Sequence, residues 1–234
     1  MNSKSSSISP DCLSLAFCPI VIPARPNSVM DCRVGIGGSM RMHVDGAEID
    51  VAEFQCTMFR ISAACVKGYD PSELFSPERP KDFALRGLFG RSSYATFSDR
   101  TLDACGSAYA DESTDVIHMD QIFVTPEWRG RRLGLYAMRA LAGAFAFDHS
   151  ALLVYQPIPA QCVPRNDLLP DQFKRYELDK FDNRAAPGTA RLRQYFAAVG
   201  FQHVPGTTCW VHDLGLCFRR WDMIDSAASK SAAR

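Results

Sequence analysis

The stretch VTPEWRGRRLG, residues 124–134, constrains the fold of this chain more than any other. It joins an apolar, strand-like segment at 115–124 to a helical run at 131–148 through a turn that holds Pro126, three arginines and two glycines. The first N–H groups of a helix have no intrahelical partner and lie at the positive end of its dipole. The sequence therefore predicts a strand-to-helix connection that binds an anion.

The side chains of this connection favour a diphosphate over a single carboxylate. Gly130 and Gly134 leave room for close approach of a ligand to the backbone, because they carry no Cβ. Arg129, Arg131 and Arg132 add forked donors that suit phosphate oxygens. The alternative is a solvated basic helix start, but arginines there oppose the helix dipole, and this small cost favours a ligand.

Patterns along the rest of the chain predict an α/β (α+β) fold with a mixed sheet flanked by helices. Glycine-rich VGIGGS at 34–39 lacks the spacing of a phosphate-binding loop and is typical of a hairpin turn or a loop before a strand. The other predicted elements are two or three strands over 39–66, short helices at 82–90 and 101–110, a buried strand at 151–158, a helix at 189–199, and a final hairpin of 201–204 with 209–214.

One domain accounts for most of the chain. We expect residues 1–30 to be a disordered or extended tail, 31–222 to be a single domain and 223–234 to be a flexible tail. The strand at 115–124 is predicted to place Val116, His118, Asp120, Ile122 and Val124 on one side.

Composition narrows the class of partner and the compartment. Lys plus Arg and Asp plus Glu number 26 each, so no global field attracts nucleic acid or an anionic membrane. The nine cysteines are scattered and form no metal-ligand spacing with histidine, which favours reduced thiols in a cytoplasmic protein and no metal. No run reaches the roughly 20 apolar residues that span a bilayer.

The segment FVTPEWRGRRLGLYAMRAL, residues 123–141, resembles the acetyl-CoA-binding motif of the GNAT superfamily of N-acetyltransferases. The pattern of that family is Gln or Arg, two residues, Gly, one residue, and Gly or Ala. Arg129, Arg132 and Gly134 occupy these positions here, so that Arg132 replaces the first glycine of the pattern. LRQYFAAVGF at 192–201 resembles a later helix of the family, and the resemblance covers about residues 115–215.

The resemblance implies a GNAT-like mixed sheet that is splayed where two neighbouring strands diverge, with acetyl-CoA in the cleft and no metal. The pantetheine amides would pair with Phe123 and Val124, and the acetyl group would pass directly to an amine acceptor. The residues implied to hold the pyrophosphate through their backbone are Arg129, Gly130, Arg131, Arg132, Leu133 and Gly134.

The transfer needs a general base for the amine and a general acid for the thiolate. Asp120 is the first candidate for the general base and His118 the second, although each suits a structural, hydrogen-bonded role as well. Relatives often carry a tyrosine acid where this chain has Phe196, which cannot donate a proton. Tyr195 is its neighbour and the remaining candidate for the acid, although it lies ~100° further around a helix.

The expected function is that of an acyltransferase, an acetyl-CoA-dependent N-acetyltransferase. The alternative is a catalytically idle GNAT-like protein that binds CoA or a partner as a sensor. The polar stretch 161–187 is long enough either to shape the acceptor site or to be a surface insertion. Neither the acceptor nor the choice between monomer and homodimer follows from the sequence.

Overall fold

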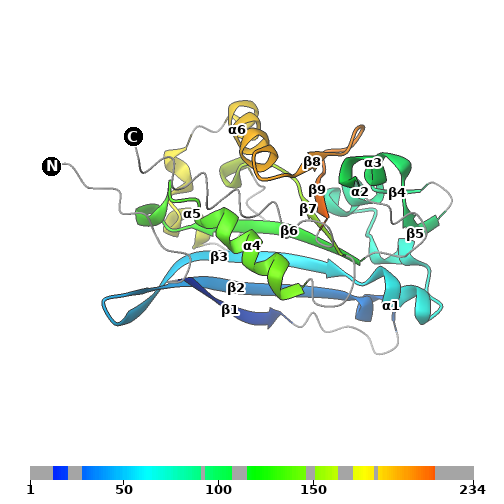
Figure 1. Cartoon of the computed structure of the whole chain (residues 1–234), viewed down its shortest axis with the longest axis horizontal. Helices are drawn as coiled ribbons and strands as arrows, with labels where there is room; N and C mark the ends of the chain where they lie inside the picture. Colours follow the sequence, from blue (N-terminus) through cyan, green and yellow to red (C-terminus); the bar gives the residue numbers. More distant parts are fainter. Residues whose placement is uncertain are drawn as a thin grey trace.

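The computed structural model describes residues 13–20, 28–90, 93–106, 115–145, 151–162, 171–181 and 184–213 (Figure 1). The predicted C-terminal tail, residues 223–234, lies outside the described residues. The strands are β1 Leu13–Ile20, β2 Arg33–Val44, β3 Ala47–Phe59, β4 Phe89–Gly90, β5 Ser93–Phe97, β6 Asp115–Val124, β7 Ala151–Tyr155, β8 Gln202–His203 and β9 Trp210–Asp213. The helices are α1 Ile61–Val66, α2 Pro80–Arg86, α3 Asp99–Cys105, α4 Leu133–Phe145, α5 Gln172–Arg175 and α6 Ala185–Ala197.

A seven-stranded sheet in the order β1-β2-β3-β6-β7-β9-β8 forms the centre of the molecule. Its neighbours are antiparallel except for β6 and β7, which are parallel and are connected through α4. A separate hairpin pairs β4 with β5. The expectation of a mixed α/β sheet flanked by helices is therefore confirmed.

Two hydrophobic cores cover the two faces of this sheet. On β7, Leu153 joins the core under α4 and α6, whereas Leu152 and Val154 join the core under α1 and α2. Alternate residues of a strand point to opposite faces, so both faces of β7 are buried. This explains why residues 151–155 are all apolar or aromatic.

The glycine-rich segment 34–39 lies inside β2, so the prediction of a turn or loop there is wrong. A Cβ on Gly38 would stand 2.3 Å from the carbonyl oxygen of Ala16 in β1 and 2.5 Å from the Cζ of Phe54 in β3. The glycine is needed for close packing between strands rather than for a turn. Sequence periodicity does not register this, because the crowding comes from neighbouring strands.

Three other boundaries differ from the sequence expectations. Residues 61–66 form α1 and not a strand, and residues 89–90 leave α2 and enter the small hairpin. Helix α6 begins at Ala185, with Pro187 in its first turn, where a backbone N–H is not required. The final hairpin of β8 and β9 is confirmed.

Strand β1 falls within residues 1–30, where a disordered or extended tail was expected. It is extended and pairs with β2 along its whole length, from Leu13 opposite Met42 to Ile20 opposite Gly35. Residues 1–12 and 21–27 lie outside the described part of the chain. None of the helices in the described ranges is both long and apolar enough to cross a membrane.

Candidate functional site

Strand β6 has the predicted bounds but contains a bulge in its middle. Cys56 of β3 pairs with Met119 and Gln55 pairs with Gln121, so Asp120 is the extra residue. Before the bulge Met119 faces the α4 core, and after it Ile122 does. The expectation that alternate residues from 116 to 124 share one side is wrong for this reason: a bulge shifts the alternation by one residue.

Beyond the bulge, β6 and β7 no longer pair. Their register runs from Asp115 opposite Ala151 to Met119 opposite Tyr155, where β7 ends while β6 continues to Val124. The β7-facing edge of residues 120–124 has no strand beside it among the described residues. A row of backbone donors and acceptors at such an edge can pair with an extended ligand.

The turn after β6 has a backbone conformation that can bind an anion. Gly130 has φ 75° and Arg132 has φ 60°, both in the left-handed region. Within the described part of the chain, the N–H groups of residues 130–134 donate to no backbone carbonyl, whereas the N–H of Leu135 donates to the carbonyl of Arg132 at 2.9 Å. Five successive free N–H groups that end in the first turn of α4 make a concavity suited to phosphate oxygens.

A cavity of about 510 Å³ opens onto this turn. It extends from the start of α4 along β6 to the end of β7 and to α6. The predicted site residues that line it are Val124, Arg129, Gly130, Arg132, Leu133, Gly134 and Tyr195. Arg132 thus has a left-handed backbone conformation, which glycine adopts more readily than other residues. It also lines the cavity.

The other two arginines of the turn are engaged by the protein. The guanidinium of Arg129 donates to the carbonyl oxygens of Val124, at 3.3 Å, and Tyr176, and it lies 4.7 Å from the ring centre of Phe181. Arg131 stacks over Trp128 at 4.5 Å and borders neither described cavity. These two side chains hold the turn and its neighbour segment in place.

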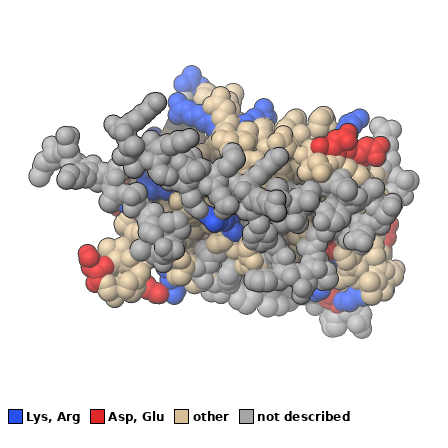
Figure 2. Space-filling model, viewed as in Figure 1, with Lys and Arg blue, Asp and Glu red and all other residues tan. Residues whose placement is uncertain are grey.

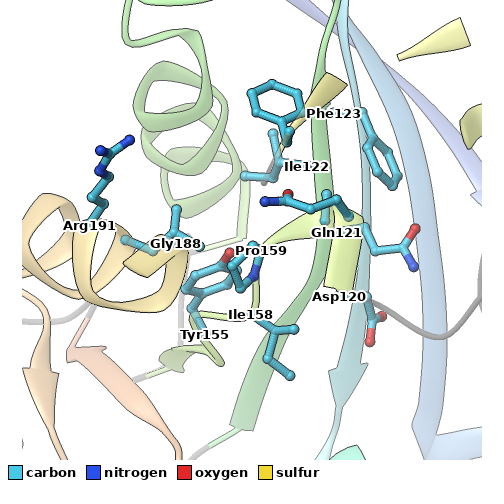
Figure 3. A pocket seen from close by; sticks show the side chains of 13 residues that line it. Asp120, Gln121, Ile122, Phe123, Tyr155, Ile158, Pro159, Gly188 and Arg191 are labelled. Atoms are coloured by element: carbon cyan, nitrogen blue, oxygen red, sulfur yellow. The ribbon is translucent and has the colours of Figure 1, made fainter. Parts of the chain in front are cut away.

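A second cavity, of about 330 Å³, adjoins the first (Figure 3). The two share Ile122, Tyr155, Arg191 and Leu192 as wall residues, so they lie side by side where β6 and β7 separate. Asp120 and Phe123 border the second cavity. Phe123 itself is 3% exposed and stacks on Tyr176 at 4.9 Å.

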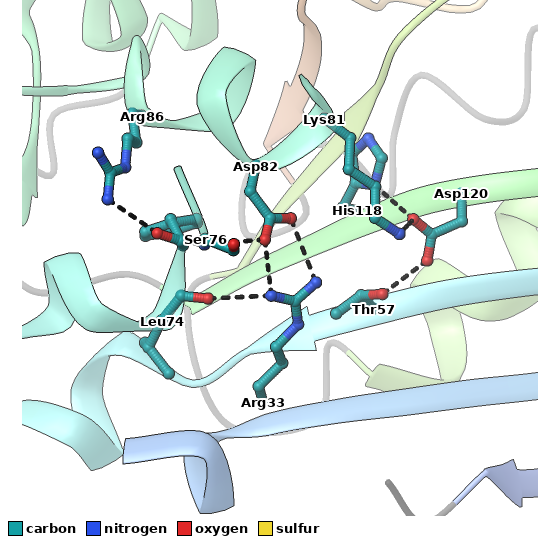
Figure 4. Close-up of polar contacts among 10 residues, drawn as sticks. Arg33, Thr57, Leu74, Ser76, Lys81, Asp82, Arg86, His118 and Asp120 are labelled. Carbon is teal, nitrogen blue, oxygen red and sulfur yellow. Dashed lines mark hydrogen bonds and ion pairs between the residues drawn. The ribbon is translucent and has the colours of Figure 1, made fainter. Parts of the chain in front are cut away.

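Asp120 lies in a network of three hydrogen bonds (Figure 4). It accepts from Thr57 Oγ1 at 2.6 Å and Lys81 Nζ at 2.6 Å, and its Oδ1 lies 3.0 Å from His118 Nδ1. Burial opposes its charge, but the hydrogen bond and charge of His118 and the ammonium of Lys81 outweigh burial and hold the pKa of Asp120 well below its usual range. Such a carboxylate takes up a proton poorly at neutral pH.

The position of His118 also suits a structural role. It is 3% exposed and borders neither of the two cavities, so its ring does not reach the groove that these adjoining cavities form. The geometry thus matches the structural role that the sequence left open for both residues.

Tyr195 and Tyr155 are the phenols of the groove. Tyr195 borders the first cavity together with residues of the turn; burial raises its pKa to about 12, against the opposing charge of Arg132. Tyr155 borders both cavities at the point where the strands diverge, and its ring packs 4.3 Å from that of Phe196. Burial raises the pKa of Tyr155 as well, so its hydroxyl stays protonated and able to donate.

Two groove residues, Tyr155 and Arg191, were missed by the sequence analysis. Tyr155 ends a buried strand parallel to β6, and ligands of α/β sheets bind at the carboxyl ends of such strands, so its position could have indicated it. Arg191 lies in the helix that resembles the family, but nothing in its local pattern separates it from Arg193. Gln161 and Phe181, from the polar stretch 161–187, also border the second cavity; residues 163–170 and 182–183 lie outside the described residues.

Comparisons with models of protein families, with curated proteins and with solved structures found no significant match. Among the described residues, no three His, Cys, Asp or Glu side chains are grouped to hold a metal.

Proposed function

We propose that this protein is an N-acetyltransferase that transfers an acetyl group from acetyl-CoA to an amine. The observation that carries the proposal is the row of free N–H groups at residues 130–134, which opens into a cavity continuous with the unpaired edge of β6. The diphosphate of CoA would accept from these groups. The pantetheine arm would pair with β6 near Phe123 and Val124.

The reaction needs no covalent enzyme intermediate. The acceptor loses one proton from its ammonium form, and its nitrogen attacks the thioester carbonyl. A C–N bond forms, the C–S bond breaks, and the thiolate leaves with the bonding electron pair. The second amine proton is released, the thiolate is protonated, and the products are an amide, CoA and one proton.

Tyr155 is the best-placed donor to that thiolate. It stands where the two cavities meet, which is the expected position of the thioester, whereas Tyr195 lies beside Arg132 at the phosphate end. Asp120 would then fix Lys81 and His118 rather than take the proton from the amine. The general base of the reaction is therefore not assigned to Asp120.

Binding of CoA to the full chain, measured by isothermal titration, tests the proposal. A Cβ on Gly134 would lie 3.9 Å from Ile122 Cγ2, an ordinary contact, so Gly134→Ala is expected to fold while adding a methyl group at the phosphate end. We expect Gly134→Ala to weaken CoA binding roughly tenfold or more, because several charge-assisted hydrogen bonds lengthen.

Gly143→Ala in the same helix is the matched control, since a Cβ there meets nothing within 4 Å. It is expected to leave CoA affinity unchanged. Absence of CoA binding at millimolar ligand in the unmodified protein, or equal affinity in both variants, contradicts the proposed site.

The engaged state of Asp120 favours one alternative, a catalytically idle relative that binds CoA or a partner as a sensor. Among the described residues that border the two cavities there is no histidine or cysteine, and the one carboxylate, Asp120, is already hydrogen-bonded to Lys81 and Thr57. Binding of CoA without formation of any acetylated product, followed by mass spectrometry because the nine cysteines would interfere with thiol reagents, would select this alternative.

A further inference from the structure

We propose that the acceptor is an amine that carries a carboxylate and an apolar group, of the α-amino-acid type. Arg191 would hold its carboxylate in the second cavity. This inference rests on the proposed acetyltransferase function. It deepens that function by naming the substrate class.

Among the described residues, the charged side chains that border the second cavity are Asp120 and Arg191. Asp120 is matched by Lys81 at 2.6 Å and already accepts three hydrogen bonds. It therefore offers little to a second ammonium group. A polyamine, an aminoglycoside or a lysine-rich peptide would bring further positive charges, and among the described residues of this cavity it would find no carboxylate other than Asp120.

Arg191 is the unmatched charge of the cavity. No carboxylate of the described residues lies within ion-pair distance of it. Helix α6 contains Arg191 and Arg193 and no acidic residue, and basic side chains gather over α6 in Figure 2. An acceptor with a carboxylate gains a forked, charge-assisted pair at this position.

Arg191 is exposed, and close packing of α6 holds the helix backbone beside the second cavity. A Cβ on Gly188 would stand only 2.7 Å from the Cγ of Pro159, so glycine lets α6 lie against the wall of the cavity. Arg191 follows one turn later on the same face of the helix. Figure 3 shows Gly188 and Arg191 on the helix that faces Tyr155.

The remaining walls of the cavity are mostly apolar. Ile122, Tyr155 and Leu192 line its inner part, and Ile158 and Phe181 stand at 48% and 41% exposed. Exposed apolar side chains beside a cavity mark a surface that a ligand can cover. An apolar side chain on the acceptor would bury them.

The test is acetyl transfer to a panel of amines by the full chain with acetyl-CoA. L-phenylalanine and L-leucine are expected to react with kcat/KM at least roughly tenfold above their amides, which lack the carboxylate, and above spermidine and kanamycin. A higher kcat/KM for spermidine or kanamycin, or equal values for the acids and their amides, overturns the inference.

Variants of α6 assign the effect to one side chain. Arg191→Gln is expected to raise KM for L-phenylalanine roughly tenfold and to leave KM for its amide unchanged. Arg193→Gln, an exposed residue that borders neither cavity, is the control and should change neither value. An unchanged KM for L-phenylalanine in Arg191→Gln overturns the assignment.

CoA titration separates this inference from the proposed function. CoA binding with acetylation of only polyamines or aminoglycosides rejects the acceptor class and keeps the acetyltransferase. Absence of CoA binding rejects the acetyltransferase and this inference with it.

Discussion

At the residue scale, Asp120 illustrates how a position in a bulge determines the chemistry of a side chain. The extra residue in β6 leaves this carboxylate beside Thr57, His118 and Lys81, which stabilise its charged form. It is 13% exposed as a side chain. A carboxylate whose charged form has this many hydrogen-bond partners stabilises the fold and is a poor proton acceptor.

Replacement of Asp120 by Asn is expected to lower the free energy of unfolding by about 2 kcal/mol at pH 7. The folded-state pKa of Asp120 is lowered, so its contribution is complete above the unfolded pKa near ~4 and is lost progressively as the pH falls from there toward the lower folded-state pKa. The difference between the two proteins should therefore shrink as the pH falls below about 4. Urea denaturation across pH measures it.

Asp103→Asn in α3 is the control, because Asp103 is exposed and forms no ion pair among the described residues. A difference for Asp120→Asn that grows as the pH falls would contradict the assigned network.

At the scale of elements, the turn before α4 keeps a left-handed backbone at a residue that is not glycine. Arg132 has φ 60°, a conformation that costs roughly 1 kcal/mol for a residue with a Cβ. The chain thereby gains a guanidinium at the border of the cavity without changing the backbone of the turn.

Two substitutions separate these effects of Arg132. Arg132→Gly and Arg132→Ala both remove the guanidinium and should weaken CoA binding to a similar extent. Only Gly relieves the backbone, so Arg132→Ala is expected to be less stable than Arg132→Gly by roughly 1 kcal/mol in thermal or urea unfolding. Equal stability of the two variants would show that residue 132 does not keep its left-handed conformation in solution.

At the scale of the whole molecule, a buried ion pair connects α2 to the start of β2 (Figure 4). Arg33 and Asp82 meet at 2.7 Å with side chains 2% and 0% exposed. Arg33 also donates to the carbonyl of Leu74, and Asp82 accepts from the N–H of Ser76. The next residue, Lys81, binds Asp120, so α2 is attached to the sheet at two adjacent positions.

Removal of one partner of this pair is expected to be far more costly than removal of both. Asp82→Ala should lower the free energy of unfolding by about 3–5 kcal/mol, because it leaves the Arg33 charge buried and unmatched. The double variant Arg33→Met with Asp82→Leu should lie closer to the unmodified protein than Asp82→Ala does. Chemical denaturation of the three proteins measures this, and a double variant that is as unstable as Asp82→Ala, or less stable, would contradict it.

The sequence alone determined the elements whose signals are local. Strand β6 and helices α4 and α6 follow from apolar periodicity, the last hairpin follows from turn residues, and the free amides before α4 follow from a helix start rich in glycine. These features depend on residues near one another in the chain. Because the first N–H groups of a helix have no intrahelical partner, the sequence predicts a candidate anion site at 129–134.

The tertiary structure decided everything that depends on a neighbour distant in sequence. It placed residues 34–39 inside a strand, where Ala16 and Phe54 leave no room for a Cβ on Gly38, and it reversed the alternation of β6 through a bulge against β3. It brought Tyr155 and Arg191 to one groove and matched Asp120 with Lys81. Such contacts join residues tens of positions apart, and no local pattern encodes which side chains they bring together.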